Sequence, residues 1–343
     1  GPHQYVVIVP DVDFYKTYEC SFIQIVGVSN KFISPLLLPI TYNILIPKYA
    51  KGRDINVIFN LADIPIKSNI KQLFLFDWAY AVYPESIAWK RMNKKDLFKR
   101  RLKLFYFKRN IKYVDSFIAQ NEIIKGRLEK IYGLRNVVSI NNPVSLDNFN
   151  ITLEGKVDFA IPDGVKLLYL TYYYSHKNLE IFLKLARLIK KEQSDFKLVV
   201  TIDKSHGRNA ERFLEVVVRE KLEDIIVNIG PVKMEHVASL YQQCDALLMP
   251  TLLESFSGSY VEAMYHKRPI ITSDFDFAKI VCKDAAVYFD PLDEKDIFNK
   301  ISLVFDPQSE LKEVLTQRAM KRLGEFNSWG QVFEKYQNLI LKL

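Results

Sequence analysis

The sequence predicts an α/β protein with two Rossmann-like, doubly wound domains that face each other across a cleft. Its 343 residues are enough for two ordinary domains. Its composition, 49% hydrophobic and 13% aromatic, is typical of a globular protein with a large core. Short apolar runs alternate with helix-like stretches along most of the chain, which is the pattern of parallel sheets covered on both faces by helices.

The alternation is most regular in the second half. Between the apolar runs lie amphipathic stretches such as "KNLEIFLKLARLIKKE" and "MEHVASLYQQC". Short hydrophobic runs separated by helices of this length indicate βαβ units and a parallel sheet. The six predicted strands cover residues 166–171, 196–202, 225–230, 245–250, 268–273 and 285–290.

The first half shows the same alternation less clearly. The segment 143–164 has little periodicity and two prolines, so we place the linker there. The predicted domains therefore cover residues 4–145 and 146–325. The strand candidates of the first domain cover residues 5–10, 22–28, 55–61, 72–78, 116–121 and 136–142.

Cysteine and histidine usage gives no sign of a disulfide framework or a zinc site. The three cysteines contain no CxxC pair, and the five histidines are scattered. The apolar stretch 32–47 is shorter than the ~20 residues of a membrane span and contains three prolines. We expect it to form a buried helix or irregular core.

Positive charge is concentrated in the first half. Residues 1–150 hold 22 Lys and Arg against 12 Asp and Glu, whereas residues 151–343 hold 26 against 28. The stretch 89–113 alone carries eleven basic residues and one acid, with aromatic residues between them. Such a helix can lie on an anionic membrane surface, bind nucleic acid or form an ordinary solvated face.

The stretch "LLESFSGSYVEAM" (252–264) places Glu254 and Glu262 eight positions apart. It follows the predicted strand "DALLMP" and leads into a helix, so it is a loop at the carboxyl end of the sheet. Backbone N–H groups at the start of that helix would suit a phosphate. The alternative is a simple capping box, Ser259-x-x-Glu262, which needs no ligand but leaves Glu254 unexplained.

The longer segment "PTLLESFSGSYVEAMYHKRPIITSD" resembles the E-x7-E signature of retaining, nucleotide-sugar-dependent glycosyltransferases of the GT-B fold, the group 1 or family 4 type, which includes enzymes of bacterial surface-polysaccharide synthesis. The resemblance is strong over residues 165–343 and weaker over 55–145. It implies that the last segment, 326–343, forms a helix that returns to the first domain. Relatives open with a strand and a glycine-rich turn. No such turn follows "YVVIVP", so the first βα unit of the family is expected to be missing.

The resemblance gives the loop residues roles. Glu262 would accept hydrogen bonds from the donor ribose, and Glu254 would lie at the donor sugar. The backbone amides of the segment between them would hold the diphosphate, namely those of Phe256, Ser257, Gly258 and Ser259.

A second set of residues would surround the leaving group. Lys177 matches the family's phosphate-binding lysine, and a cation there stabilises the departing nucleoside diphosphate. His176 would contact phosphate or sugar. Tyr172 stands where many relatives have an arginine. Either another basic residue, such as Lys204 or Arg208, supplies that charge, or the diphosphate is held with one cation fewer.

Asp77, at the end of "QLFLFDW", would contact the sugar or the acceptor from the first domain. The "DVD" at 11–13 and the "DFD" at 274–276 resemble the metal-binding pair of other glycosyltransferases. We expect no metal and no cofactor besides the nucleotide-sugar donor, and we assign Asp274 and Asp276 to a loop and a helix N-cap.

The predicted function is a metal-independent, retaining hexosyltransferase. It would use a UDP- or GDP-sugar and a glycan acceptor, which we expect to be lipid-linked, to build a surface polysaccharide such as O-antigen or capsule. It would act in the cytoplasm, peripherally at the inner face of the membrane, without nucleic acid as a partner. The alternatives are a protein or small-molecule glycosyltransferase, or a basic nucleic-acid-binding protein that is not an enzyme.

Overall fold

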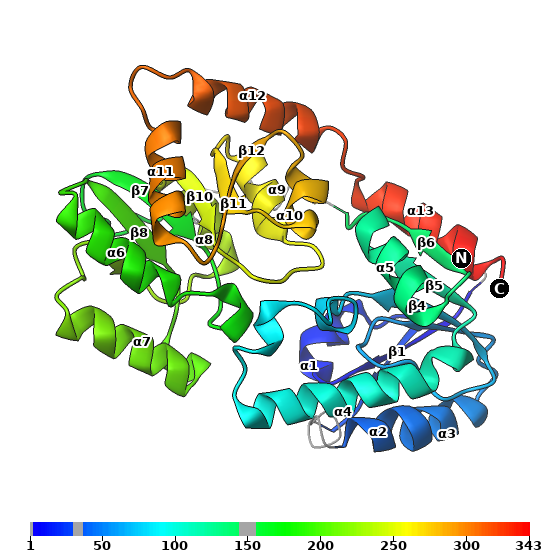
Figure 1. Cartoon of the computed structure of the whole chain (residues 1–343). Helices are drawn as coiled ribbons and strands as arrows, with labels where there is room; N and C mark the ends of the chain where they lie inside the picture. Colours follow the sequence, from blue (N-terminus) through cyan, green and yellow to red (C-terminus); the bar gives the residue numbers. More distant parts are fainter. Residues whose placement is uncertain (1–2, 30–36, 144–155) are drawn as a thin grey trace.

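A computed structural model describes residues 3–29, 37–143 and 156–343 and shows two α/β units, one from each half of the chain (Figure 1). Part of the predicted linker, residues 144–155, lies outside the described residues. So do residues 32–36 of the apolar stretch 32–47. The remainder of that stretch is helical and continues to residue 51, through α2 (Leu38–Ile40), a π-helical turn (Thr41–Leu45) and α3 (Ile46–Lys51).

The second half forms one parallel sheet of six strands in the order β12-β11-β10-β7-β8-β9. Each strand falls within or next to an apolar run of the sequence, because a strand covered on both faces must be apolar throughout. The strands are β7 (Val165–Tyr169), β8 (Phe196–Val200), β9 (Ile226–Asn228), β10 (Ala246–Met249), β11 (Ile270–Ser273) and β12 (Ala286–Phe289).

The strand order reverses between β7 and β10. From β7 the chain moves outward to β8 and β9, then returns to the other side of β7 and moves outward again through β10, β11 and β12. In open α/β sheets, ligands bind beyond the carboxyl ends of the strands at such a reversal. The two loops that leave this point carry Lys177 and Glu254.

Helices cover this sheet with one apolar face each. In α6, for example, Phe182, Leu185 and Ile189 recur at helical spacing and are fully buried. The helices are α6 (Ile181–Lys191), α7 (Arg208–Arg219), α8 (Met234–Gln243), α9 (Gly258–Tyr265), α10 (Asp276–Cys282), α11 (Glu294–Val304) and α12 (Leu311–Leu323).

The first half differs from the single sheet that a Rossmann-like domain would contain. A four-stranded parallel sheet has the order β3-β4-β5-β6, and β1 and β2 form a separate two-stranded sheet in the described part of the chain. The physical reason is burial: β4 is almost wholly buried, whereas β1 and β2 are largely exposed or half-buried. The strands are β1 (Tyr5–Val9), β2 (Ile23–Gly27), β3 (Val57–Asn60), β4 (Lys71–Phe76), β5 (Ser116–Ala119) and β6 (Val137–Ser139).

The helices of the first half include α1 (Val12–Tyr15), the long basic helix α4 (Lys94–Asn110) and α5 (Glu122–Tyr132). The last helix of the chain, α13 (Trp329–Ile340), also lies on this unit, beside β6 and α5 in Figure 1. Its Val332 is fully buried in a cluster with Leu73, Ile118 and Ile140. No helix in the described ranges is long and apolar enough to cross a membrane.

Candidate active site

An ion pair joins the two loops at the reversal of the strand order. Lys177 Nζ lies 2.6 Å from Glu254 Oε1, and the two side chains are only 17% and 12% exposed. Lys177 follows β7 and Glu254 follows β10, so the pair connects the loops of two neighbouring strands. In this sheltered position a Coulomb attraction is screened far less than at an open surface.

Further hydrogen bonds fix the positions of these two loops relative to each other. The Thr251 hydroxyl lies 3.0 Å from the same Glu254 oxygen and 3.2 Å from the His176 carbonyl. The Leu252 amide donates to that carbonyl at 2.7 Å. The short helical turn Ser175–Lys177 is therefore fixed to the segment that carries Glu254.

Glu262 lies on the first turns of α9 and faces a buried tyrosine. The Tyr241 hydroxyl donates to Glu262 Oε2 at 3.0 Å. Burial raises the pKa of Glu262, and this hydrogen bond lowers it in part. The capping-box alternative is wrong, because the N-cap of α9 is Ser257 and no side chain caps the helix.

The loop that contains Glu254 leads directly into the N-terminus of α9, whose N-cap is Ser257. The first N–H groups of a helix have no acceptor within it. Ser257 is buried, Phe256 and Ser259 are half-buried, and Gly258 is exposed. Phe256 packs its ring near Phe326, with 6.3 Å between the ring centroids. The structure thus brings Glu254, Glu262, Lys177 and these amides to one edge of the sheet.

Asn178 is a central residue of this site that the sequence analysis missed. It is fully buried and adopts a left-handed backbone conformation with φ of 58°. Its Nδ2 donates to the carbonyls of Pro250 and Pro291, which follow β10 and β12. Asparagine is one of the few residues that tolerate this conformation, so an asparagine directly after the lysine was the available signal.

His176 and Tyr172 belong to a row of stacked rings beside Lys177. Tyr172 is 45% exposed and stacks on His206, and His176 stacks on Tyr174. Burial lowers the pKa of His176 to about 4, with Glu254 opposing this shift and Lys177 and Arg100 adding to it. His176 is therefore neutral at pH 7, and its Nδ1 has no hydrogen-bond partner among the described residues.

The other side of the site comes from the first half of the chain, through Asp77 at the end of β4. The residue is exposed overall, but the protein packed around its carboxyl and the negative charge of Asp63 together raise its pKa to about 6, against an opposing effect of Lys103. The Asp77 carbonyl accepts from the Ser255 hydroxyl at 2.9 Å, and Asn121 donates to the Ser255 carbonyl at 2.9 Å. Asp77 thus lies directly opposite the loop of Glu254.

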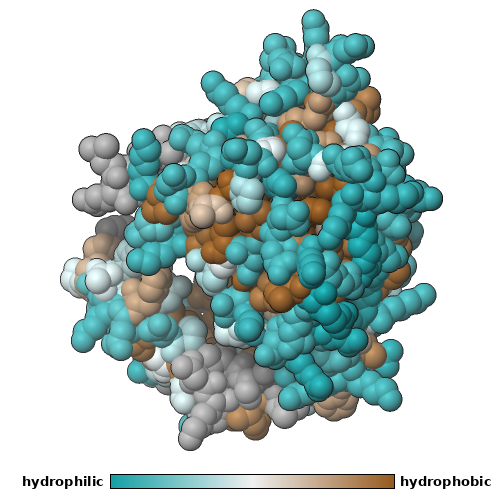
Figure 2. Space-filling view, turned by 90° about the vertical axis from the view of Figure 1, so that its left-hand side faces the viewer, coloured by the Kyte–Doolittle hydropathy of each residue, from teal (hydrophilic) through white to brown (hydrophobic). Residues whose placement is uncertain are grey.

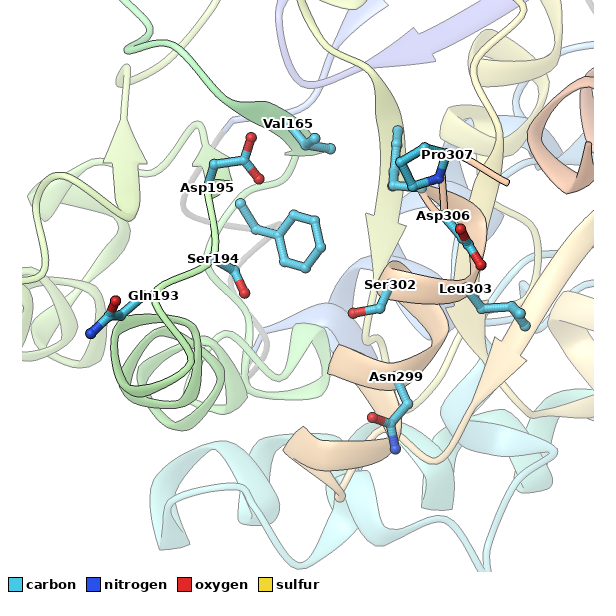
Figure 3. A pocket seen from close by; sticks show the side chains of 11 residues that line it. Val165, Gln193, Ser194, Asp195, Asn299, Ser302, Leu303, Asp306 and Pro307 are labelled. Atoms are coloured by element: carbon cyan, nitrogen blue, oxygen red, sulfur yellow. The ribbon is translucent and has the colours of Figure 1, made fainter. Parts of the chain in front are cut away.

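Figure 2 shows the face of the molecule that lies on the left-hand side of Figure 1. Hydrophilic side chains cover most of it, hydrophobic side chains gather in a band across the upper part, and the surface is hollowed between the upper and lower parts (Figure 2). A distinct surface pocket lies elsewhere, at the amino ends of β7 and β8 beside the end of α11 (Figure 3). Because Val165 and Phe196 of that pocket begin their strands, it lies on the edge of the sheet away from Lys177 and Glu254.

Aspartates of both DxD sequences bond to neighbouring residues of the protein. Asp11 caps α1 by accepting from the Phe14 amide, and Asp274 pairs with Lys279. The N-cap assignment of Asp276 is wrong, because Phe275 is the N-cap and Asp276 is the first residue of α10. Among the described residues, no three His, Cys, Asp or Glu side chains are grouped as a metal site would require.

Asp276 instead contacts the first half of the chain. It accepts a hydrogen bond from the Tyr83 hydroxyl at 2.9 Å and lies 2.8 Å from Arg127 Nη2. Arg127 also pairs with Glu85 at 2.7 Å. These bonds connect the two units on the side of α10 and α5.

The basic stretch 89–113 does not form one uniform face. Arg91 donates to Asn178 Oδ1 at 2.6 Å, Arg100 lies over the ring of Tyr80, and Lys103 pairs with Asp63 over the ring of Trp78. Most of the remaining basic residues are exposed, namely Lys90, Lys94, Lys95, Arg101, Lys108, Arg109 and Lys112. Three of the eleven cations thus contact other parts of the protein rather than solvent alone.

Comparison with known proteins agrees with this geometry. Residues 164–306 match the family "Glycosyl transferases group 1". The O-antigen chain mannosyltransferase RfbU of Salmonella typhimurium is 26% identical over 194 residues, which is 56% of this chain and 51% of that protein. A D-inositol 3-phosphate glycosyltransferase of Paenarthrobacter aurescens is 26% identical over 117 residues, or 33% of this chain and 28% of that one. The chain therefore spans about half, or less, of the length of these relatives.

Solved structures are similar over nearly the whole chain. A glycosyltransferase of Rickettsia africae has a TM-score of 0.71 and 17% identity, covering 99% of this chain and 90% of that one. The Anabaena protein HepE, solved with UDP and glucose, has a TM-score of 0.71 and 12% identity, covering 99% of this chain and 100% of that one. Residues 164–306 thus resemble a group 1 glycosyltransferase domain, within a chain that has the GT-B fold.

The buried histidines predict a specific pH dependence of stability. Burial lowers the pKa of both His176 and His266 to about 4, below the value near 6.5 of an unfolded histidine. Between these values the unfolded chain binds more protons at each histidine, so their contribution to the free energy of unfolding falls as the pH falls from about 6.5 to about 4. The raised pKa of Asp77 acts in the opposite direction below about pH 6, so the effect of the histidines is isolated by comparing variants with the wild type. Each such histidine lowers the free energy of unfolding by up to about 1.4 kcal/mol per pH unit across this range.

Urea unfolding at pH 7, 6 and 5 measures this decline. His176→Asn should reduce the decline, whatever its effect on stability at pH 7, while the same change at the exposed His3 should leave the decline as in the wild type. An unchanged decline in the His176 variant would contradict the assignment of a buried, neutral imidazole.

Proposed function

We propose that this chain transfers a sugar from a UDP- or GDP-sugar to a glycan acceptor with retention of configuration, in the assembly of a surface polysaccharide. The observation that carries the proposal is the buried pair of Lys177 and Glu254, set beside the N-terminus of α9 at the reversal of the strand order. The group 1 domain is consistent with this reaction. A surface-polysaccharide product is suggested by the name of the Salmonella relative, and a uridine donor by the HepE complex.

The donor would lie across the carboxyl ends of β7 and β10. Its diphosphate would meet the first amides of α9 and the ammonium group of Lys177, since a helix N-terminus and a cation both favour an anion. The carboxylate of Glu262 would accept hydrogen bonds from the ribose. Glu254, in the loop before α9, would contact the hydroxyl groups of the sugar.

In the reaction, the bond between the sugar's anomeric carbon and the diphosphate oxygen breaks, and an acceptor oxygen bonds to that carbon on the same face. The acceptor's proton passes to the departing phosphate oxygen. Negative charge grows on the diphosphate as the bond breaks, so Lys177 stabilises the transition state more than the bound donor. Asp77, whose carbonyl accepts a hydrogen bond from Ser255 next to Glu254, would contact the sugar or the acceptor from the first unit.

The two glutamates should have separable effects. Glu262→Ala should weaken the binding of UDP or GDP about 10-fold or more, because a hydrogen bond to a charged group contributes about 1.5–3 kcal/mol. Glu254→Ala should leave nucleotide affinity nearly unchanged and lower the rate of nucleoside diphosphate release from the matching nucleotide sugar. Titration calorimetry and a nucleotide-release assay over UDP- and GDP-sugars measure the two quantities.

The exposed Glu235 is the matched control for both substitutions. Glu235→Ala should behave as the wild type in both assays. If Glu254→Ala and Glu262→Ala also keep wild-type affinity and rate, neither carboxylate contacts the donor and the proposed site is wrong.

We further propose that no metal ion takes part. Lys177 and the α9 amides would neutralise the diphosphate, so donor binding and transfer should survive an excess of EDTA. The measurement is nucleotide release and UDP or GDP affinity with EDTA, with MgCl₂ and with MnCl₂. Loss of activity in EDTA that Mn²⁺ restores would overturn this part of the proposal.

Association with an anionic membrane is a last part of the proposal. Phe98 and Phe105 of α4 are 61% and 55% exposed, and Lys94, Arg101 and Lys108 share their side of the helix at helical spacing. Each basic residue near an anionic bilayer contributes about 1 kcal/mol, so this face would suffice for reversible binding. Such a surface would bring the enzyme to a lipid-linked acceptor.

Vesicle co-sedimentation at low salt tests this expectation. The wild type should bind vesicles that contain phosphatidylglycerol, and a variant with Lys94, Arg101 and Lys108 changed to glutamine should bind much less. The control changes Lys184, Lys191 and Lys221, three exposed lysines of the second half, in the same way and should bind as the wild type. Equal sedimentation of all three proteins, or far tighter binding to duplex DNA, would contradict a membrane role for α4.

A further inference from the structure

The two loops that carry Lys177 and Glu254 offer little free positive charge for a diphosphate. Their cation Lys177 is already paired with Glu254 at 2.6 Å, and Glu262 adds a second carboxylate nearby. Tyr172, an uncharged residue, occupies the loop between β7 and Lys177 and stacks on His206. A nucleoside diphosphate carries two or more negative charges, so a further cation in the cleft would strengthen its binding considerably.

Arg100 of α4, in the first half of the chain, is a cation that no acidic side chain of the described residues neutralises. Its guanidinium carbon lies 4.2 Å from the centre of the Tyr80 ring. Among residues 3–29, 37–143 and 156–343, no carboxylate pairs with it and no hydrogen bond engages it. Its neighbours differ: Arg91 is bound to Asn178, and Lys103, one turn along α4, is paired with Asp63.

The ring beneath Arg100 also contacts the donor side. Tyr80 is 4% exposed, and its ring lies edge-on to His176 with 5.7 Å between the centroids. His176 directly precedes Lys177, so a single buried ring separates the Arg100 guanidinium from the Lys177 loop. The charge of Arg100 also contributes to the lowered pKa of His176, after burial and Lys177, which agrees with this proximity.

We infer that Arg100 is a second phosphate-binding residue, which contacts the donor diphosphate from the first half of the chain. The inference rests on the proposed function, because it assumes a nucleotide-sugar donor. Stacking on Tyr80 holds the guanidinium in place before the ligand arrives, so little side-chain entropy is lost on binding. The N–H groups at the edge of the guanidinium are available to two phosphate oxygens at once.

This arrangement makes leaving-group stabilisation depend on both units of the fold. Lys177 and the α9 amides come from the second half of the chain, and Arg100 comes from the first. The diphosphate would therefore be fully neutralised only while the two units face each other as they do here. Arg100 would bind the diphosphate in the ground state and still more strongly as charge grows on the departing oxygen.

Titration calorimetry of the full chain with UDP, GDP, uridine and guanosine tests the inference. Arg100→Gln should lower the affinity for the nucleoside diphosphate that the wild type binds by about 10-fold or more. The affinity for the matching nucleoside should stay the same, because only the phosphates would contact Arg100. The diphosphate affinity of Arg100→Lys should lie between those of the wild type and Arg100→Gln, because a lysine keeps the charge but lacks the planar guanidinium group. Arg109→Gln, an exposed arginine near the other end of α4, is the matched control and should bind as the wild type.

The nucleoside affinity also reports on folding, because a variant that binds the nucleoside as the wild type does has an intact base and ribose site. Equal diphosphate affinity in the wild type and Arg100→Gln would overturn the inference and leave the proposed function standing. A loss confined to Lys204→Gln or Arg208→Gln would also overturn it, by assigning the second cation to the loop after β8. A wild type that binds neither nucleotide would overturn the proposed function together with the inference.

Discussion

The geometry of the candidate site depends on one buried asparagine. Asn178 lies directly after Lys177, adopts a left-handed backbone conformation, and donates to two carbonyls that follow β10 and β12. Its own side-chain oxygen accepts from Arg91 of the other half of the chain at 2.6 Å. A fully buried amide that lost these partners would leave polar groups unpaired, at about 1–3 kcal/mol each. The loops after three strands and the contact with the first unit are thus fixed together at one point.

The segment that follows β10 belongs structurally to both halves of the chain. Glu254 faces Lys177 within the second unit, while the next residue, Ser255, bonds to Asp77 and Asn121 of the first. The Leu252 carbonyl accepts from Ser86, also of the first unit. Any movement of one unit relative to the other must therefore break bonds made by the same short segment that carries the candidate sugar-binding carboxylate. Domain motion and the position of Glu254 are coupled through the backbone.

The sequence predicted most of the fold because alternation of buried strands and amphipathic helices is a local property. All twelve apolar runs contain or adjoin a strand. The separate pairing of β1 and β2 could not be predicted, because which strands pair is decided by distant parts of the chain. In the site, the E-x7-E spacing and Lys177 were visible in the sequence. The roles of Asn178, Tyr80 and Arg100 were not, because they depend on contacts between residues up to about a hundred positions apart or across the two halves.

The ion pair of Lys177 with Glu254 explains how a phosphate site can remain stable without its ligand. A lone ammonium group held in so sheltered a position would lose much of its hydration without compensation. Glu254 and Thr251 supply that compensation, and they also fix the position of Lys177. A bound diphosphate would take over part of this interaction and free Glu254 to accept hydrogen bonds from the sugar. In the proposed reaction, the carboxylate beside the lysine would thus have a structural function before binding and a recognition function after it, which would account for a negative group so close to the place proposed for an anion.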